Sequence, residues 1–316
     1  MTTNDYTIII PTWNRSLELS NTILSILKYC NLNLCEILII DSYSDDNSEN
    51  IVTNIMIQNN FSRFRYFNTT TNTPSHKRNM GISYCQTKWV LFLDDDCCIT
   101  SNFFNIIEST INNAKEKVIF SGVVNYPQKW ILKSAYFRYR DSLHFKEKAN
   151  IYKESLSPFK IVTMNLLANA NELKKSKLFF DENFVFHNED TDFAISANKK
   201  GFNLYPMNAS VVHFETSKGV RNYYQKMKNM RCKGLRLVIE KHPEITNKLN
   251  MPWSFFYSDC NAVTFKRTLF KFIFPSFFVS LLLTWLENNQ SLTFFPFKKF
   301  LIQYIILAAY SRGNDE

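Results

Sequence analysis

Two short apolar runs near the start of the chain enclose a segment with helical periodicity. The first run covers residues 6–10 and stops at Pro11, and the second covers residues 36–40 and stops at Asp41. Continuous apolar runs of this length are typical of strands buried in a parallel sheet. After Ser16, apolar residues recur at helical spacing: Leu17, Ile23, Leu24, Ile26 and Leu27. The order strand, helix, strand predicts a βαβ unit.

The same alternation continues beyond the second run. Ile51 and Ile55 indicate a second helix, residues 64–67 a third strand and residues 89–93 a fourth. This order predicts an α/β fold with helices on both faces of the sheet. Ligands bind at the carboxyl ends of the strands in such sheets, so we expect a site there. Three polar residues follow these strands: Thr12, Asp41 and Asp94.

Three consecutive carboxylates, Asp94, Asp95 and Asp96, follow the strand predicted at residues 89–93. Their mutual repulsion is unfavourable unless a cation lies among them. Mg²⁺ and similar hard ions prefer carboxylate oxygens and bridge them to nucleotide phosphates. A solvated acidic loop is the alternative, but the apolar strand before the aspartates and Ile99 after them indicate burial. The run therefore predicts a divalent-cation site beside a phosphate ligand.

Composition excludes several classes of protein. With 316 residues, 45% hydrophobic and 21% charged, the chain has enough apolar side chains for a full core and is not mainly disordered. None of the seven cysteines forms a CxxC pair, which excludes a disulfide scaffold or a zinc ribbon and indicates reduced thiols. Residues 1–13 lack the features of a secretory signal, so we expect this end to face the cytoplasm.

Charge divides the chain into two parts. Residues 1–217 hold 22 Lys and Arg against 22 Asp and Glu, whereas residues 218–316 hold 15 against 6. We therefore expect one domain over residues 1–217 and a basic, helical C-terminal region over residues 218–316. A basic region suits nucleic acid or an anionic membrane. Twelve of the 29 Phe lie between Phe255 and Phe300, which favours a membrane surface over nucleic acid.

An apolar segment over residues 269–286 has one charge in 18 positions, the lower limit for a membrane-spanning helix. Pro275 would kink it, and the polar stripe of Ser276, Ser280 and Thr284 suits a helix lying in the membrane interface or packed on protein. A second run over residues 300–310 is too short to span alone. We expect peripheral attachment; core helices of a soluble subdomain and a true span remain alternatives.

Several segments between residues 6 and 215 together resemble a known family. They are IIIPTWNR at 8–15, ILIIDSYSDDN at 37–47, PSHKRNMGI at 74–82, FLDDDC at 92–97, FDENFVFHNEDTDF at 180–193 and VVHFE at 211–215. In this order they resemble the motifs of the inverting family-two glycosyltransferases of GT-A fold, which use nucleotide-sugar donors. The resemblance implies a GT-A, Rossmann-like mixed sheet flanked by helices over residues 1–217.

The resemblance also implies roles for individual residues. For the nucleotide sugar it implies contacts from Pro11, Thr12, Asn14, Asp41, Arg78, Asp94 and Asp95. For a metal ion, Mn²⁺ or Mg²⁺, it implies Asp94, Asp96 and His213, with Asp96 as the direct ligand. For the catalytic base it implies Asp190, with Glu189 as its neighbour. The chain departs from the family pattern at Ser42, where an acid is common, and at residues 177–179 before the acceptor-side segment.

Each of these residues also has a structural interpretation. Asp41 suits a cap on the turn that follows it, and Asp190 an acid at a helix N-terminus. A histidine such as His213 is more often a core side chain than a ligand, and Arg78 is either a surface charge or a phosphate partner. These alternatives stay open at the level of the sequence.

The resemblance implies transfer of a sugar to an acceptor hydroxyl with inversion. We expect a role in cell-surface polysaccharide or glycolipid synthesis, on a glycan or lipid-linked acceptor at the inner face of the cell membrane. A nucleotidyltransferase that makes the activated sugar is an alternative, but PTWNRSLELS lacks the glycine-rich loop that it needs. A catalytically inactive glycan- or membrane-binding protein of the same fold is another. No motif supports nucleic-acid binding.

Overall fold

A computed structural model describes residues 5–31, 33–144, 155–185, 187–215, 219–248 and 272–312. The chain divides into two compact units. The first comprises Met1–Pro127, His144–Val185 and Glu189–Glu215, and the second Gln128–Leu143, Phe186–Asn188 and Thr216–Glu316. The expected boundary at residue 217 stays a prediction. Two short helices that precede it, α5 (Gln128–Lys133) and α6 (Ala135–Asp141), belong to the second unit.

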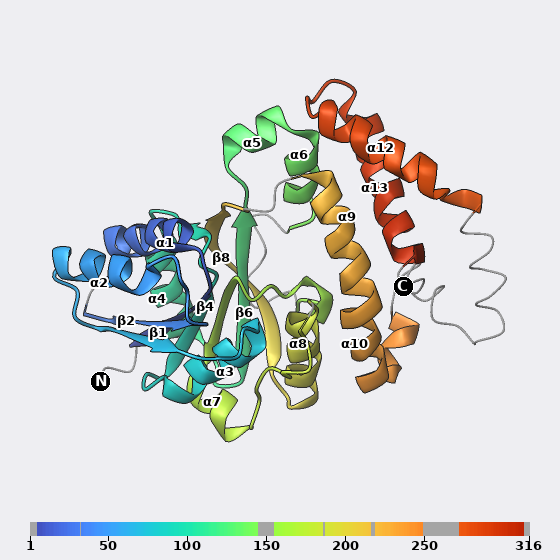
Figure 1. Ribbon diagram of the computed structural model, residues 1–316. Helices are drawn as coiled ribbons and strands as arrows, with labels where there is room; N and C mark the ends of the chain where they lie inside the picture. The colour runs from blue at the N-terminus through green and yellow to red at the C-terminus, as the bar shows by residue number, and fades with distance from the viewer. Residues whose placement is uncertain are drawn as a thin grey trace. The chain divides into compact units, whose positions relative to one another are not determined.

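The first unit contains one mixed eight-stranded sheet in the order β3-β2-β1-β4-β7-β6-β8-β5 (Figure 1). Its strands are β1 (Tyr6–Thr12), β2 (Cys35–Asp41), β3 (Phe64–Asn68), β4 (Trp89–Leu93), β5 (Cys97–Ile99), β6 (Val118–Asn125), β7 (Asn165–Asn169) and β8 (Asn203–His213). The first four strands of that order are parallel, β7 is antiparallel to both of its neighbours, β8 is parallel to β6, and β5 is antiparallel to β8.

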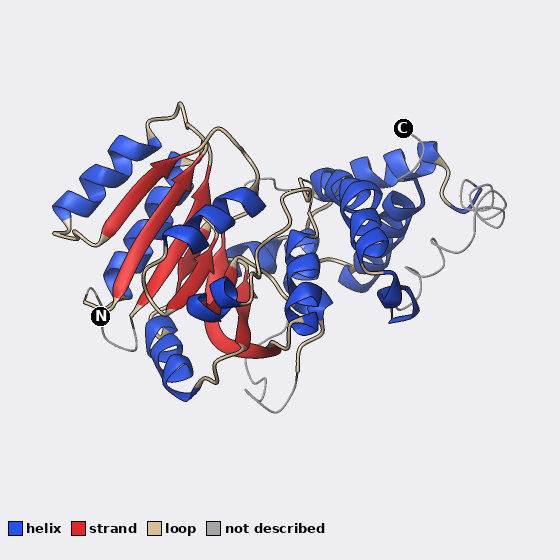
Figure 2. Ribbon diagram, turned by 90° about the horizontal axis from the view of Figure 1, so that it is seen from below, coloured by secondary structure: helices blue, strands red, loops and turns tan. Residues whose placement is uncertain are grey.

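Helices cover both faces of this sheet (Figure 2). They are α1 (Ser16–Tyr29), α2 (Ser48–Gln58), α3 (Pro74–Tyr84), α4 (Phe103–Asn113), α7 (Ala170–Lys175) and α8 (Glu189–Lys199), with a 3₁₀ turn at Pro158–Lys160. The predicted α/β class is confirmed, as are the first four strands and the helices between the first three. The helix N-terminus expected at Asp190 is also present, since α8 begins at Glu189.

The alternation of side chains along each strand builds the two halves of the core. In β1, Ile8 and Ile10 join the cluster that includes side chains of α1, α2 and α4, whereas Ile9 joins the cluster on the opposite face with side chains of α3, α7 and α8. In β2, Ile39 and Ile40 divide between the faces in the same way. Because both faces are buried, these strands are apolar at almost every position.

Helix α3 approaches the sheet closely at Gly81. A Cβ atom built there would lie 2.5 Å from Cγ2 of Ile9 in β1, closer than carbon atoms pack. Glycine therefore lets the helix backbone lie directly on the strand. This close approach holds the N-terminal half of α3 at the carboxyl end of β1.

The second unit is helical. Beyond α5 and α6 it contains α9 (Val220–Asn229), a π turn at Met230–Leu235, α10 (Arg236–Lys241), a 3₁₀ turn at Pro243–Lys248, α12 (Ser276–Asn288) and α13 (Phe295–Arg312). The sequence predicts one continuous helix from Val220 to the residue before Pro243. The structure differs by the π turn, which contains Gly234, a poor helix former.

The apolar segment at residues 269–286 lies partly outside the described residues, since 269–271 are not among them. Its described part does not form one helix, because α12 begins only after Pro275. The run at 300–310 lies inside α13. Over the described ranges, every helix is too short or too polar to cross a membrane.

Candidate active site

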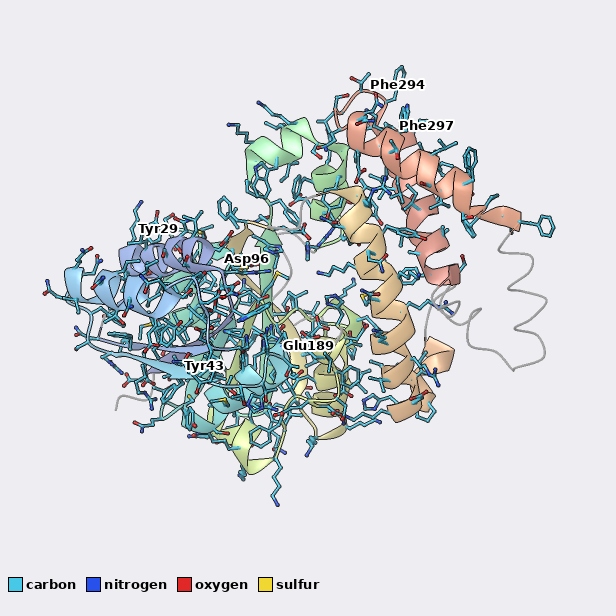
Figure 3. All side chains as sticks on the ribbon, in the orientation of Figure 1. Tyr29, Tyr43, Asp96, Glu189, Phe294 and Phe297 are labelled. Atoms are coloured by element: carbon cyan, nitrogen blue, oxygen red, sulfur yellow. The ribbon has the colours of Figure 1, made fainter. Side chains whose placement is uncertain are left out.

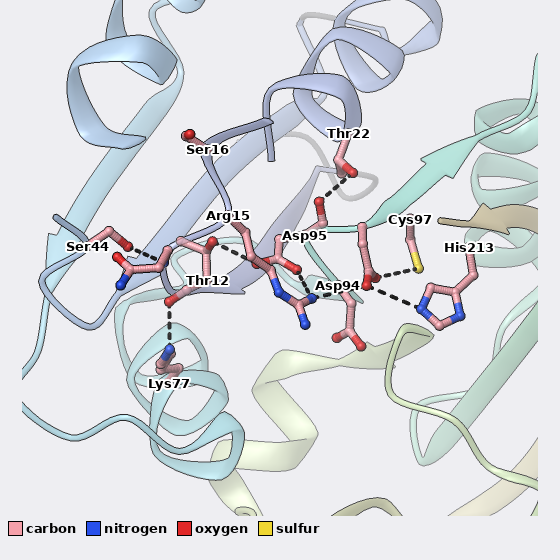
Figure 4. Close-up of polar contacts among 12 residues, drawn as sticks. Thr12, Arg15, Ser16, Thr22, Ser44, Lys77, Asp94, Asp95, Cys97 and His213 are labelled. Atoms are coloured by element: carbon pink, nitrogen blue, oxygen red, sulfur yellow. Dashed lines mark hydrogen bonds and ion pairs between the residues drawn. The ribbon is translucent and has the colours of Figure 1, made fainter. Parts of the chain in front are cut away.

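The carboxyl ends of β1, β2 and β4 meet at one edge of the sheet. Thr12 and Asp41 are register partners at the ends of β1 and β2, and the aspartate run begins directly after β4. The polar contacts among these loops are drawn in Figure 4. The structure thus brings together at one edge the polar strand ends that the sequence predicts.

The loop after β1 is tied to the loops after β2 and β4. The hydroxyl of Thr12 donates to Oδ2 of Asp95 at 2.7 Å. The backbone N–H of Asn14 donates to Oγ of Ser44 at 2.7 Å, and its side-chain oxygen accepts the N–H of Asp45 at 2.9 Å. Asn14 has a positive φ of 50°, which an asparagine tolerates better than most residues. These contacts hold two predicted donor-binding loops in one arrangement.

Asp41 makes the contacts of a turn cap. Its carboxylate accepts the N–H of Ser44 at 3.0 Å, the hydroxyl of Ser44 at 2.6 Å and the hydroxyl of Tyr66 at 2.9 Å. The side chain is buried. The structural interpretation of Asp41 is therefore confirmed, and its contact with a nucleoside, like that of Pro11 beside it, stays a prediction.

The three consecutive aspartates point in different directions. Asp95 is turned inward: it accepts Thr12 and the guanidinium of Arg15, the latter at 2.9 Å, and its carbonyl accepts the hydroxyl of Thr22 at 2.8 Å. Burial raises the pKa of Asp95 to about 7, against the lowering effect of the charge on Arg15. Asp95 is thus a buried anchor for the β1 loop.

Asp96 faces a different neighbour. Its Oδ2 lies 3.1 Å from Nη1 of Arg15 and 3.3 Å from Nε2 of His213, the last residue of β8. Burial by itself raises the pKa of Asp96, but the hydrogen bond and charge of His213, with the charge of Arg15, hold it below the usual value. The register pairs His213 with Cys97, so the sheet itself brings the histidine to the aspartate run.

Two buried cations on α3 reach the same edge. Lys77 donates from Nζ to the carbonyl of Thr12 at 2.6 Å and to Oδ1 of Asn72 at 2.8 Å. Burial lowers the pKa of Lys77 to about 8. Arg78 donates from Nη2 to Oδ1 of Asp94 at 2.9 Å and from Nη1 to Oε1 of Glu189 at 3.2 Å.

Arg78 is therefore not a surface charge, since its side chain is only 3% exposed. Burial alone lowers the pKa of Arg78, but the charges of Asp94 and Glu189 outweigh it and raise the pKa above its usual value. The guanidinium also lies over the ring of Phe180, 5.6 Å from its centroid. One side chain thus joins the strand edge to the start of α8.

Asn79 links α3 to the acceptor-side segment. Its side-chain oxygen accepts the N–H of Phe180 at 2.8 Å, and its amide donates to the carbonyl of Phe180 at 2.8 Å and to Glu182 at 2.9 Å. Phe180 in turn stacks on Phe193 of α8, with ring centroids 4.1 Å apart. These contacts fix α8 beside α3.

Glu189 and Asp190 begin α8. Glu189 binds Arg78, whereas Oδ1 of Asp190 accepts the N–H of Thr191 at 2.7 Å. The latter contact is that of an acid at a helix N-terminus, so this interpretation of Asp190 is confirmed. The carboxylate is half-buried, and its role as base stays a prediction. Figure 3 labels Asp96 and Glu189 on the ribbon.

The residues predicted to hold a metal ion are only partly assembled. Asp96 and His213 are in contact, but Asp94 is turned to Arg78, and within the described ranges no three His, Cys, Asp or Glu side chains converge on one point. The donor types nevertheless suit Mn²⁺ or Mg²⁺, since carboxylates lead the set. Nδ1 of His213 is buried without a hydrogen-bond partner among the described residues.

Two residues that bind the aspartates or the end of β1 are absent from the sequence-based assignments. Arg15 contacts both Asp95 and Asp96, and Lys77 holds the carbonyl of Thr12. Both lie inside segments that carry the resemblance, PTWNR and PSHKR, and each is a cation next to an assigned polar residue. A position next to an assigned polar residue is the sequence feature that could have identified these two cations. It does not show whether a cation is buried or solvated.

Comparison with known proteins gives relatives of one kind. A 96-residue stretch is 35% identical to an uncharacterized glycosyltransferase of Haemophilus influenzae, covering 30% of this chain and 37% of that protein. A 219-residue stretch is 23% identical to the GalNAc(5)-diNAcBac-PP-undecaprenol beta-1,3-glucosyltransferase of Campylobacter jejuni, covering 63% of this chain and 70% of that protein. The chain spans about two fifths of the H. influenzae protein and of glycosyltransferase GlyG of Streptococcus pneumoniae.

Solved structures with the same fold include TarS of S. aureus, residues 1–349, with a TM-score of 0.54 and 13% identity over 98% of this chain and 90% of that chain. A mannosyltransferase from Pyrobaculum calidifontis, in complex with GDP-Man and Mn²⁺, gives a TM-score of 0.58 and 14% identity over 98% and 86% of the two chains. At these identities the likeness shows the fold, which is GT-A. The model of glycosyl transferase family 2 matches residues 7–170, more than half of the chain. The chain therefore belongs to glycosyl transferase family 2.

Proposed function

We propose that this chain moves a sugar from a nucleotide-diphosphate sugar to an acceptor hydroxyl with inversion at the anomeric carbon. The observation that carries the proposal is the position of Arg78, which binds Asp94 at the strand edge and Glu189 at the start of α8. The first carboxylate belongs to the edge expected to bind the donor, and the second to the helix expected to carry the base. A donor bound at the strand edge and an acceptor bound at the start of α8 are therefore neighbours.

The nucleoside lies at the loops after β1 and β2, against Pro11, Thr12, Asn14 and Asp41. The contacts of Asn14 with Ser44 and Asp45 preform these loops before a ligand arrives. Arg15 and Lys77 supply positive charge close to the aspartates, which complements the negative charge of a diphosphate.

Asp94, Asp96 and His213 would hold a metal ion, Mn²⁺ or Mg²⁺, with Asp95 behind them as the anchor. When bound, it neutralises charge on the leaving diphosphate. Asp96 is already kept ionised by His213 and Arg15, the state that a metal ligand needs. Asp94 now binds Arg78 and would have to turn from it to join such a ligand set. Support for metal use comes from the P. calidifontis mannosyltransferase, which was solved in complex with Mn²⁺ as well as GDP-Man.

Asp190 is the general base. Its carboxylate takes the proton of the acceptor hydroxyl, the hydroxyl oxygen bonds to the anomeric carbon, and the bond from that carbon to the diphosphate oxygen breaks. A single displacement from the face opposite the leaving group inverts the configuration. Glu189 is a positioning residue in this step, since it fixes the first turn of α8 to Arg78.

For the acceptor we propose a lipid-linked glycan or a polysaccharide of the cell surface. The name of the C. jejuni relative gives an undecaprenol-diphosphate-linked glycan as its acceptor, which supports this class. Lipid-linked glycans of this kind are amphipathic, so we also place the reaction at the inner face of the cell membrane, with the chain attached peripherally.

Donor binding tests the proposal most directly. Thermal-shift and calorimetric titrations use UDP-, GDP- and dTDP-sugars with and without Mn²⁺, on the unsubstituted chain, Asp96→Asn and the control Glu116→Gln. Glu116 is exposed and precedes β6, at the end of the sheet opposite the carboxyl ends of β1, β2 and β4. We expect one nucleotide class to bind in a Mn²⁺-dependent way and Asp96→Asn alone to lose it. A folded chain that binds none of these donors would overturn the proposal and favour an inactive binding protein.

A further inference from the structure

Helix α12 of the second unit buries one set of apolar side chains and exposes another. Its buried residues are Val279, Leu283 and Leu286. On another face Phe277, Leu281 and Trp285, spaced four apart, are 75%, 51% and 39% exposed. Residues four apart lie above one another on a helix, so the three side chains form one exposed apolar stripe.

Helix α13 extends the stripe. The rings of Trp285 and Phe297 contact each other, with centroids 6.4 Å apart, and Phe278 contacts Tyr304 further along both helices at 6.0 Å. Phe297 and Phe300 are 55% and 61% exposed. We call the exposed residues of both helices the aromatic face: Phe277, Phe278, Leu281, Trp285, Phe297 and Phe300. Figure 3 labels Phe297 and its neighbour Phe294, which is also exposed.

The polar side of α12 is turned to α9 in the same unit. Arg221 of α9 donates to the hydroxyl of Thr284 at 3.1 Å and to Oε2 of Glu287 at 3.2 Å. The predicted polar stripe thus contacts α9 at Thr284, although its three residues are themselves exposed. A helix at the surface of a soluble domain normally has one apolar stripe, which is covered, whereas α12 has a second one that is exposed. An exposed contiguous apolar surface of this kind marks a binding site.

The charges around the aromatic face are positive. Over residues 272–311 the sequence has one acid, Glu287, against Lys298 and Lys299. The acid is paired with Arg221. Lys298 is buried over the ring of Trp285, 5.8 Å from its centroid, whereas Lys299 is half-buried. The exposed Arg138 of α6 lies over the ring of Phe295 in α13, 4.9 Å from its centroid. The face therefore combines large aromatic side chains with a cationic border formed by Arg138 and Lys299.

This chemistry fits the surface of a bilayer that contains anionic lipids. Aromatic rings bind at the boundary between headgroups and acyl chains, and neighbouring cations bind acidic headgroups. At 13 residues α12 is too short to cross the bilayer, so it lies in the interface. A second copy of the chain fits less well, because it would bring two cationic borders together.

We propose that the aromatic face of α12 and α13 binds the headgroup boundary of anionic membranes and anchors the chain peripherally. The inference rests on the membrane location in the proposed function and names the surface responsible. It requires neither donor binding nor sugar transfer.

Sedimentation with vesicles tests it on the full chain. The vesicles are phosphatidylcholine alone and phosphatidylcholine mixed with phosphatidylglycerol. We expect binding to the mixed vesicles and a loss of at least about tenfold in the double variant Phe277→Ser, Phe297→Ser, since two aromatic rings leave the interface. The control is Leu17→Ser with Ile57→Ser, which removes two exposed apolar side chains from α1 and α2 in the first unit. It should bind like the unsubstituted chain.

Three results would overturn the inference. They are failure of the unsubstituted chain to bind either vesicle, equal binding by the double variant, and a concentration-dependent dimer in analytical ultracentrifugation that the double variant abolishes. Circular dichroism melts verify that both double variants fold. Nucleotide-sugar binding is measured on the same samples without vesicles, so a failure of the membrane inference is distinguished from a failure of the proposed function.

Discussion

Arg15 donates from Nη1 to Oδ2 of Asp96 at 3.1 Å, so a guanidinium occupies a carboxylate oxygen that is proposed to bind a divalent ion. The same nitrogen contacts Asp95 at 2.9 Å. Cation and guanidinium compete for the same negative charge. A bound ion would therefore release Arg15, whose charge becomes free for the diphosphate of the donor.

We expect Arg15→Gln to bind Mn²⁺ alone more tightly, by about tenfold, because a competing positive charge is removed at a site where solvent reduces its effect. Electron paramagnetic resonance of free Mn²⁺ gives the affinity. Arg15→Lys keeps the charge and should stay close to the unsubstituted chain. Equal affinities in all three proteins would show that Arg15 does not compete with the ion.

Replacing Arg78 by Met leaves Asp94 and Glu189 without their shared cation. We expect the free energy of unfolding to fall by about 3–5 kcal/mol, as for other broken buried ion pairs. Chemical denaturation measures it. Arg65→Met is the matched control, because Arg65 pairs with Glu36 at the edge strand β3 and is more exposed. Its loss should cost about 1 kcal/mol or less. A similar loss in both variants would contradict the bridging role of Arg78.

Asp190→Asn should reduce sugar transfer by about 10²–10⁴-fold, the usual contribution of a general base. An asparagine oxygen still accepts the N–H of Thr191, so the start of α8 is preserved. Donor affinity, measured by calorimetry, should therefore stay within about twofold while transfer is lost. Full turnover in this variant would remove Asp190 as the base.

Gly81→Ala tests the close approach of α3 to β1. The added methyl group overlaps Ile9, and we expect a net loss of about 1–3 kcal/mol in the free energy of unfolding despite the better helix propensity of alanine. Ser83→Ala, at an exposed position of the same helix, should be nearly neutral. Thermal unfolding compares the two. A much smaller cost of Gly81→Ala in an Ile9→Ala background would identify the clash as the cause, because alanine lacks all three of the overlapping atoms of Ile9.

Lys77 gives a pH dependence with a defined sign. Its pKa of about 8 in the folded chain is below the unfolded value, so the folded state binds fewer protons between these two pKa values. Burying the charge of Lys77 destabilises the folded state fully below pH 8. This destabilisation disappears as the pH rises above 8, because the amine loses its proton. We expect the unsubstituted chain to gain about 2 kcal/mol relative to Lys77→Met as the pH rises towards 10. Denaturation at several pH values measures this, and parallel curves would contradict it.

Local patterns predicted much of the fold because they depend on neighbours in the sequence. The runs at residues 6–10 and 36–40 became β1 and β2, since strands buried on both faces must be apolar throughout. The order of the sheet beyond β4 was not predicted. Strand β7 comes late in the chain but pairs with β4, and such a pairing leaves no periodic signal in either segment.

The same difference applies to the candidate site. The segments that resemble the family identified Asp94, Asp96, Asp190 and His213 as candidate site residues. They did not show what each of these side chains contacts. Arg78 and Glu189 are 111 positions apart, and Asp96 and His213 are 117 apart. Contacts over such separations depend on how the strands and helices pack together.

By itself the sequence determined the α/β class, the first four strands and the family, because apolar periodicity and motif order are properties of neighbouring residues. Only the tertiary structure decided which carboxylates are paired. Asp95 turns inward to Thr12, Asp94 binds Arg78, and Asp96 meets His213 through the register of β5 and β8. Three adjacent aspartates are chemically identical in the sequence, and they differ only because each faces a different element of the folded chain.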